Sequence, residues 1–418
     1  MKVLLLTDQN IESDRTFVIG GWIQSFINAL KDSRTLQPGV VGTAQNRSSK
    51  KTVDHVTFYM VGDHAGNPVK RIIDRWRCKI EDRRVIAGYV DAMHDFQPDI
   101  IHIFGVESFV CRVIPFAQCK VVVHLQGILN PCLNAWFPPA VSKKLSVLKS
   151  FRLFDSVRGI TLGRAYRRFA KIAAREQEYF KNIRFAMGRT HWDKTITLNF
   201  MNGVHYFHVE ELLRSEFFAA QQWQLLKNDS TFRILSILSP NLYKGFDTVL
   251  KTAALLVRLN IKFDWHICGA AASDKAVKTI ERTVKSRFKE SSVYFHGKKN
   301  ATEVVEMMHQ SNLYVHPSYI ENSANSVCEA QLLGMPVVAT NVGGTASIIE
   351  NGKTGILVPA NDPYYLAGVI NSLMQNPETA AALGAKARVA ALRRHDRNTV
   401  IQNVEAVYSE IYSSKVQD

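Results

Sequence analysis

The sequence predicts an α/β fold with two Rossmann-like domains that face each other, each built on a parallel sheet. Short β-branched runs alternate with helical patterns along most of the 418 residues. Such alternation is typical of parallel sheets with helices on both faces. It stops at the polar stretch Lys227–Thr231 and then starts again. Because a chain of this length exceeds one ordinary core, we expect two domains.

The strands are expected where short apolar runs end at polar or turn-forming residues. In the first half they are Lys2–Leu6, Val56–Met60, Ile100–Phe104, Lys120–Leu125 and Arg184–Met187, with helices between them that begin with Trp22–Leu30. In the second half they are Arg233–Leu238, Phe263–Cys268, Val293–Phe295, Leu313–His316 and Val337–Ala339. The connecting helices are expected at Phe246–Leu259, Ala276–Phe288, Thr302–Ser311 and Ser326–Leu333.

The chain beyond Pro359 reads as helices only, at Tyr365–Met374, Thr379–Ala391 and Thr399–Tyr412. The last helix carries four apolar residues at helical spacing, namely Val400, Val404, Val407 and Ile411. A helix with such an apolar stripe has to bury it, so we expect it to pack against another part of the protein.

The net charge of +15 is concentrated in one part of the chain. Residues 143–194 contain 14 Lys and Arg against 4 Asp and Glu. A local basic surface attracts an anionic partner such as a membrane, a nucleic acid or a phosphorylated substrate. The six cysteines form no C-x-x-C pair, and the histidines show no metal-ligand spacing. We therefore expect no disulfide framework and no metal site, and a reducing cytoplasm fits.

Two glutamates, Glu321 and Glu329, lie eight residues apart around small polar residues. Ser326-x-x-Glu329 matches a capping box, which starts a helix and needs no ligand. Alternatively, the small residues leave backbone N–H groups at the helix start open to a phosphate, while the two carboxylates accept hydrogen bonds from sugar hydroxyls. A nucleotide sugar carries hydroxyls, a diphosphate and a ribose, and so fits the second interpretation.

The E-x7-E motif is followed by LLGMPVVAT and NVGGTASIIENGKTGILVP, and this order resembles the family-four retaining glycosyltransferases of the B fold (group 1 glycosyltransferases). Supporting matches are PDIIHIFG at 98–105, VVVHLQG at 121–127, GRTHWD at 188–193, YKGFDTVLKTAALL at 243–256, WHICG at 265–269 and YFHG at 294–297. The resemblance implies an acceptor-binding domain at 1–226 and a nucleotide-sugar domain at 227–396. It also implies that the C-terminal helix, about 397–418, packs back on the N-terminal domain.

The activity implied by this resemblance is a retaining, metal-independent transfer of a hexosyl group. The donor would be a UDP- or GDP-linked sugar, and the acceptor a saccharide or a lipid-linked saccharide in bacterial surface polysaccharide synthesis. Glu321 would bind hydroxyls of the donor sugar, and Glu329 the ribose. The sugar and the diphosphate would approach the amides of the residues between them, Asn322, Ser323, Ala324 and Asn325. Lys244 would neutralise the leaving diphosphate, where the developing charge is largest.

Two positions depart from the family pattern. The family has an arginine shortly before Lys244, whereas no arginine stands between Arg233 and Lys244 here. Gln126 occupies the place where many relatives have a histidine, and His124 stands two residues earlier, on the same face of the expected strand. His124 is either a structural histidine or a group near the reacting sugar. Gln126 can bind a sugar hydroxyl but cannot act as a base, so the leaving phosphate would take the acceptor proton.

Two glycine-containing turns belong to the same expected site. Gly20 and Gly21 follow the first strand, where they are either a flexible turn or a close backbone approach to the donor phosphate. They do not form a G-x-G-x-x-G sequence, so a nicotinamide cofactor is not indicated. His296 and Gly297 match the loop that usually borders the nucleobase in the family.

The basic stretch 163–184 reads as a helix with Arg164, Arg167, Arg168, Lys171 and Arg175 crowded together. It is either the solvated face of a packed helix or a contact with anionic lipids. In the second case residues 143–194 would hold a cytoplasmic enzyme at the inner face of the plasma membrane.

Three rival functions remain for the whole chain. The basic composition alone would suit a nucleic-acid-binding protein, but no recognition motif is present. A sugar-nucleotide epimerase also uses Rossmann-like domains. The missing arginine and histidine would suit an inactive glycosyltransferase-like subunit that only binds.

Overall fold

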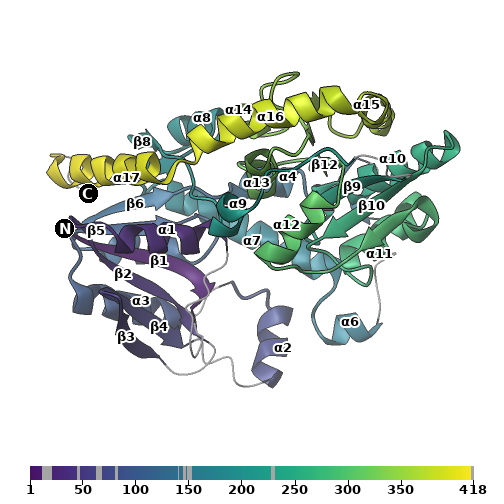
Figure 1. Ribbon diagram of the computed structural model, residues 1–418. Helices are drawn as coiled ribbons and strands as arrows, with labels where there is room; N and C mark the ends of the chain where they lie inside the picture. The colour runs from purple at the N-terminus through teal and green to yellow at the C-terminus, as the bar shows by residue number, and fades with distance from the viewer. Residues whose placement is uncertain are drawn as a thin grey trace. The chain divides into compact units, whose positions relative to one another are not determined.

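The computed structural model describes residues 1–11, 21–44, 48–62, 68–80, 83–139, 141–144, 147, 153–226 and 231–415. The chain divides into two compact units (Figure 1). Unit 1 comprises Met1–Leu133, Phe154–Leu212 and His395–Asp418, and unit 2 comprises Asn134–Leu153 and Leu213–Arg394. Each unit is built on its own sheet. The fold class predicted from the sequence is therefore confirmed.

Unit 1 contains a sheet of eight strands in the order β3-β4-β2-β1-β5-β6-β7-β8. All neighbours are parallel except the edge strand β3, which is antiparallel to β4. The strands are β1 (Lys2–Asn10), β2 (Gln37–Ala44), β3 (Ser49–Val53), β4 (Val56–Gly62), β5 (Ile100–Phe104), β6 (Lys120–His124), β7 (Phe185–Gly188) and β8 (His205–His208).

Helices cover both faces of this sheet. They are α1 (Trp22–Lys31), α3 (Arg83–Phe96), α7 (Leu162–Phe180), α8 (His191–Phe200) and α17 (Arg397–Ser413), with the 3₁₀ helix η1 (Val110–Phe116). The helix α2 (Pro68–Trp76) also belongs to unit 1. The short helices α4 (Leu129–Asn134) and α6 (Leu153–Val157) lie near the unit boundaries in the sequence. Alternate residues of β1 enter opposite cores: Val3 and Leu5 join the cluster with α1 and α17, and Leu4 and Leu6 the cluster with α3. This is the two-residue period of a strand that is buried on both faces.

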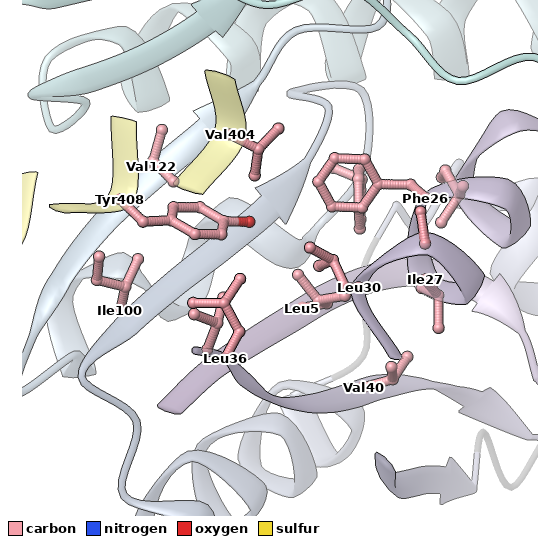
Figure 2. Close-up of a cluster of buried hydrophobic side chains, with 14 of the residues drawn as sticks. Leu5, Phe26, Ile27, Leu30, Leu36, Val40, Ile100, Val122, Val404 and Tyr408 are labelled. Carbon is pink, nitrogen blue, oxygen red and sulfur yellow. The ribbon is translucent and has the colours of Figure 1, made fainter. Parts of the chain in front are cut away.

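The C-terminal helix α17 packs on the unit 1 sheet, as predicted (Figures 1 and 2). Val404 and Tyr408 lie in the cluster with Ile100 of β5 and Val122 of β6 (Figure 2). The Tyr408 hydroxyl is 2.6 Å from Nδ1 of the buried His102. Lys120 donates a 2.9 Å hydrogen bond to the Ile411 carbonyl near the end of the helix. The apolar stripe read from the sequence is therefore the docking face.

Unit 2 contains a fully parallel sheet in the order β11-β10-β9-β12-β13-β14. Its strands are β9 (Phe232–Ile237), β10 (Phe263–Cys268), β11 (Val293–Phe295), β12 (Leu313–His316), β13 (Val337–Thr340) and β14 (Ile356–Val358). Its helices are α9 (Ser215–Ala219), α10 (Phe246–Arg258), α11 (Lys275–Val284), α12 (Ala301–His309), α13 (Asn325–Leu333), α14 (Thr345–Ile348), α15 (Pro363–Gln375) and α16 (Pro377–Arg394), with the 3₁₀ turns η2 (Leu242–Lys244) and η3 (Lys289–Ser291).

The basic stretch 163–184 forms α7, and part of its charge is directed into unit 1. Side chains one to three turns apart bind backbone carbonyls at the end of α2 and in the segment after it. Arg164 donates to the Trp76 carbonyl at 2.7 Å, Lys171 to Arg77 at 2.9 Å, and Arg175 to Ile80 at 3.2 Å. Basic side chains thus satisfy the carbonyls that the end of a helix leaves open. Four of the five basic positions singled out in the sequence have a structural contact of this kind, since Arg168 also approaches the Lys79 carbonyl at 3.4 Å.

Candidate active site

Two loops of unit 2 meet beyond the carboxyl ends of β9 and β12, at the edge where open α/β sheets bind ligands. The first is η2 with Gly245, and the second runs from Pro317 to α13. A Cβ on Gly245 would lie 2.0 Å from the Pro317 carbonyl oxygen, and Gly245 has a φ of +81°. Only glycine allows both this φ and this approach. The Tyr319 N–H also donates to the Tyr243 carbonyl at 2.8 Å. The loop contact places Lys244 beside Glu321.

Glu321 is held by three polar side chains. Its Oε1 accepts a hydrogen bond from the Lys244 ammonium and lies 3.1 Å from His316 Nε2. The Ser318 hydroxyl is 3.4 Å from the same oxygen and 3.0 Å from His316 Nε2. The Glu321 side chain is 14% exposed and that of Lys244 17%. A carboxylate, a lysine and a histidine therefore form one largely buried cluster, of which the sequence had singled out Glu321 and Lys244 as chemical groups.

The cluster keeps Glu321 ionised. Burial by itself raises the pKa of this carboxyl, but the Lys244 charge and the His316 hydrogen bond outweigh it and lower the pKa to about 2. The balance follows from a paired charge in a poorly solvated place, where a cation at contact distance stabilises the anion strongly. Glu321 is thus an acceptor of hydrogen bonds at neutral pH and cannot serve as an acid.

The backbone of Glu321 is fixed by a second loop. The Gly344 N–H donates to the Glu321 carbonyl at 3.0 Å. A Cβ on Gly343, which has a φ of +50°, would lie 1.9 Å from the same carbonyl oxygen. The NVGG sequence after β13 therefore packs against the backbone of the Glu321 loop. The close contact requires a glycine at Gly343.

The residues between the two glutamates form the start of α13. The N-cap is Ala324, and no side chain caps the helix. Asn322 and Ala324 are buried, whereas Ser323 and Asn325 are partly exposed. Because the helix begins at Asn325, Ser326 lies inside it and Glu329 is not its third residue. The capping-box interpretation of Glu329 is therefore wrong, and the uncapped helix start is of the kind that binds phosphate.

Glu329 forms a two-pronged ion pair with Arg214. Arg214 Nε donates to Oε1 at 2.7 Å and Nη2 donates to Oε2 at 2.8 Å. The Glu329 side chain is 4% exposed and that of Arg214 is 24% exposed. The sequence analysis missed Arg214, because it stands in an irregular segment just before α9 and 115 residues from its partner. No local pattern could have joined the two.

His296 and Gly297 follow β11. His296 Nε2 lies 2.9 Å from Nδ1 of His266 in the neighbouring strand β10. Both rings line a surface cavity of about 480 Å³ together with Arg233, Lys299 and Glu303. Burial and the nearby Lys299 charge lower the pKa of His296. Gly297 has a φ of +67° with open space at its Cβ position. The His296 side chain thus contacts the sheet, and the backbone of the turn stays accessible.

The site residues expected in unit 1 differ from one another in burial. Gly20 lies outside the described residues, and Gly21, with a φ of +70°, is exposed directly before α1. His124 ends β6 and is fully buried against the rings of Trp22 and Phe104, and neither ring nitrogen has a hydrogen-bond partner among the described residues. Burial lowers its pKa far below the usual value. Gln126 lies beyond the strand end and is partly exposed. Burial in the core favours the structural interpretation of His124.

Glu107 is a further carboxyl in unit 1 that the sequence analysis passed over. It follows β5, as Gln126 follows β6, and it accepts a hydrogen bond from the Gly127 N–H. Burial, with a contribution from the nearby Glu176 carboxylate, raises the pKa of Glu107 to about 7. The available signal was a glutamate three residues after a strand, at the edge where parallel sheets bind ligands.

The described residues contain neither a metal-ligand cluster nor a membrane-spanning helix. No three His, Cys, Asp or Glu side chains come together there as metal ligands. None of the described helices combines the length and the hydropathy needed to cross a membrane.

Part of the chain is similar in sequence to known proteins. Residues 217–390 match the family described as Glycosyl transferases group 1. The D-inositol 3-phosphate glycosyltransferase of Arthrobacter sp. (strain FB24) is 33% identical over 175 residues, 41% of this chain and 40% of that protein. The 2-deoxystreptamine N-acetyl-D-glucosaminyltransferase of Niallia circulans is 26% identical over 172 residues, 41% and 42% of the two chains. The chain thus aligns with about two fifths of the length of these curated relatives.

Solved structures extend the likeness to the whole fold. Sucrose-phosphate synthase from Thermosynechococcus elongatus matches with a TM-score of 0.71 at 13% identity, over 99% of each chain. Anabaena HepE in complex with UDP-glucose matches with a TM-score of 0.63 at 17% identity, over 98% of this chain and 100% of that one. Two Rossmann-like units with parallel sheets, and α17 on the first, define the glycosyltransferase B fold. Over residues 217–390 the chain is similar to the group 1 glycosyltransferases.

Proposed function

We propose that the protein transfers a sugar from a nucleotide-sugar donor to a saccharide or lipid-linked saccharide acceptor, with retention of configuration and without a metal ion. The observation that supports this most directly is the Lys244–Glu321–His316 cluster. The Glu321 carboxylate can accept hydrogen bonds from sugar hydroxyls, and the Lys244 ammonium can bind a phosphate. The similarity of residues 217–390 to the group 1 glycosyltransferases supports the same chemistry.

Each residue of the proposed donor site would have its own role. Glu321, ionised and fixed at its backbone, accepts hydrogen bonds from hydroxyls of the donor sugar. Lys244 and the amides at the uncapped start of α13, around Asn322 to Asn325, bind the diphosphate and stabilise the charge that grows on it as the glycosidic bond breaks. Glu329 accepts hydrogen bonds from the ribose. The leaving phosphate oxygen takes the acceptor proton, since the Gln126 amide cannot.

The donor is proposed to be UDP- or GDP-linked. The relatives with D-inositol 3-phosphate and 2-deoxystreptamine in their names transfer sugars to small polar acceptors, and the HepE structure holds UDP-glucose. Acceptor contacts would lie in unit 1, where Gly21, Gln126 and Glu107 stand at or beyond strand ends. A role in bacterial surface polysaccharide synthesis would fit such a transferase.

The place of action is proposed to be the inner face of the plasma membrane. Exposed apolar side chains of unit 1, Val69, Ile73 and Trp76 on α2 and Val157 on α6, stand among exposed arginines. The Trp76 indole donates to the Val157 carbonyl at 2.9 Å, which joins the two helices. Apolar side chains with a basic rim suit anionic lipid. Flotation with phosphatidylglycerol vesicles should capture the wild type, and equal capture of Ile73→Asp with Arg158→Glu would contradict the membrane contact.

Turnover of donor tests the proposed function. The protein is incubated with a panel of UDP- and GDP-sugars, and release of nucleoside diphosphate is followed with and without saccharide acceptors. Transfer predicts slow release without acceptor and faster release with the right one. Interconversion of the sugars without release would indicate the sugar-nucleotide epimerase. Binding without any turnover would indicate the inactive subunit, and no binding would remove the proposal.

A further inference from the structure

Glu321 has two charged or titratable partners, one on a turn and one on a central strand. Lys244 stands on the 3₁₀ turn η2, and its ammonium ends a flexible four-carbon stem. His316 is the last residue of β12, which lies between β9 and β13 in the unit 2 sheet. The His316 side chain is 2% exposed and that of Lys244 is 17% exposed. Lys244 can therefore turn to a ligand, whereas His316 stays in place.

The position of His316 is fixed by the strands around it. His316 pairs with Ala339 of the neighbouring strand β13, and the Thr340 hydroxyl donates to the His316 carbonyl at 3.3 Å. The imidazole lies nearly parallel to the buried ring of Tyr314 in the same strand, with ring centroids 6.4 Å apart. These contacts hold Nε2 of the imidazole 3.1 Å from Oε1 of Glu321.

The contact with Glu321 defines which ring nitrogen of His316 carries a proton. With a pKa of about 2, the Glu321 carboxylate is ionised at neutral pH and can only accept hydrogen bonds. His316 Nε2 is therefore the donor. The Ser318 hydroxyl, 3.4 Å from the same carboxylate oxygen, adds a second polar contact from the same loop. A neutral imidazole thus holds the carboxylate independently of the Lys244 ammonium.

The same contact decides whether Glu321 stays ionised when Lys244 turns to a diphosphate. Burial raises the pKa of the Glu321 carboxyl, whereas the Lys244 charge and the His316 hydrogen bond lower it. Lys244 and His316 are the titratable side chains that contact Glu321 within the described residues. Tyr314 adds no charge, because burial raises the pKa of its phenol. Once a diphosphate takes the ammonium, the His316 contact is the stabilising contribution that stays.

We propose that His316 is a positioning residue that keeps the Glu321 carboxylate ionised and in place for the donor sugar after the diphosphate has drawn Lys244 away. This inference rests on the proposed function, in which Glu321 binds sugar hydroxyls and Lys244 binds the diphosphate. Without the His316 donor, a buried carboxylate that loses its ammonium would take up a proton. A merely structural histidine would support the end of β12 and would leave the ionisation of Glu321 unchanged.

Proton uptake on nucleotide binding tests this inference. UDP and GDP are titrated into His316→Phe and His316→Gln at pH 6, by calorimetry in buffers that differ in ionisation enthalpy. Neither variant has an imidazole at this position, so the difference between them reports on Glu321. The glutamine amide can donate a hydrogen bond in place of Nε2, whereas the phenyl ring cannot. We expect His316→Phe to take up more protons per bound nucleotide than His316→Gln, by up to about half a proton.

Turnover gives a second readout and Thr340→Val the matched control. With a donor and an acceptor from the panel, His316→Phe should be at least about tenfold slower than the wild type, since a hydrogen bond to a charged group is lost. His316→Gln should stay within about threefold of the wild type. Thr340→Val removes the hydrogen bond to the His316 carbonyl and keeps the imidazole. It should lower the melting temperature and leave the proton uptake at the wild-type value.

The outcomes separate this inference from the proposed function. Equal proton uptake by His316→Phe and His316→Gln would overturn this inference alone, and so would turnover of His316→Gln as slow as that of His316→Phe. Uptake is counted per bound nucleotide, so a lower folded fraction of either variant does not enter the comparison. A wild type that binds neither UDP nor GDP would remove the proposed function, and this inference with it.

Discussion

The Lys244 ammonium donates a hydrogen bond to Oε1 of Glu321, and His316 Nε2 lies 3.1 Å from the same oxygen. The carboxylate and the ammonium therefore satisfy each other. A diphosphate that approaches Lys244 carries more negative charge than Glu321, so it competes for the ammonium. We expect Lys244 to turn toward the diphosphate and to free Glu321 for sugar hydroxyls.

Replacing Lys244 by Met should weaken nucleoside diphosphate binding by at least about tenfold, since a charge-assisted contact is lost. Calorimetric titration with UDP and GDP measures this. Lys251→Met is the control, because Lys251 also pairs with a carboxylate, that of Asp247 at 3.1 Å, but lies inside α10 rather than in the turn before it. Equal affinity in Lys244→Met and the wild type would contradict the diphosphate role.

The low pKa of Glu321 predicts a pH-dependent stability. With a pKa of about 2 in the folded protein and 4.5 as the ordinary value, the folded state favours the ionised form. The stabilisation, about 3 kcal/mol, is complete well above pH 4.5 and is lost as the pH falls from 4.5 towards 2. Urea unfolding gives the free energies of unfolding of the wild type and of Glu321→Gln. Their difference should be about 1 kcal/mol smaller at pH 4 than at pH 7. A constant difference between pH 7 and pH 4 would contradict the ion pair.

Gly245 should tolerate no side chain. Gly245→Ala combines a φ of +81° with a Cβ 2.0 Å from the Pro317 carbonyl oxygen, so we expect a loss of more than about 2 kcal/mol of stability. Gly297→Ala, with φ +67° but open space, should cost only about 1 kcal/mol. Thermal unfolding of the two variants measures the difference. Equal losses would contradict the contact between the Gly245 turn and the Pro317 loop.

Tyr408→Phe should destabilise unit 1. The variant keeps the buried ring but leaves His102 Nδ1, 2.6 Å from the hydroxyl, without its partner. A buried polar atom without a hydrogen bond costs about 1–3 kcal/mol. Tyr412→Phe on the same helix, where the ring is 59% exposed, is the control and should leave the unfolding midpoint unchanged. A midpoint for Tyr408→Phe equal to that of the wild type would contradict the docking contact.

Much of the fold was predictable because its strands are buried on both faces and so read as apolar runs. The ten expected strands all coincide with strands of the two sheets. The edge strands β3, β8 and β14 and the strand β2 were missed. β2 reads QPGVVGTA, and its proline and glycines predict a turn. A Cβ on Gly39 would lie 2.8 Å from the Phe96 ring, so this glycine makes room for the packing of α3. Such tertiary contacts leave no local signal.

The site was predictable where its parts are close in sequence or match the motifs of the family that the chain resembles. Glu321 and the start of α13 belong to one segment, and the K-G pair marks a loop that returns to it. Arg214 was missed because it depends on a partner brought near by the fold, whereas Glu107 had a local signal in its place three residues after β5. Whether Gln126 and His124 contact a substrate stays a prediction, although the buried ring of His124 makes the structural role the better explanation.

Kinetics of Glu321→Gln test the central claim most directly. With donor and acceptor from the panel, turnover should fall by at least about a hundredfold, because the neutral amide cannot hold the sugar hydroxyls as the carboxylate does. The dissociation constant of the nucleoside diphosphate should stay within about threefold of the wild-type value. Turnover of Glu321→Gln equal to that of the wild type would contradict the assignment of this loop as the donor-sugar site.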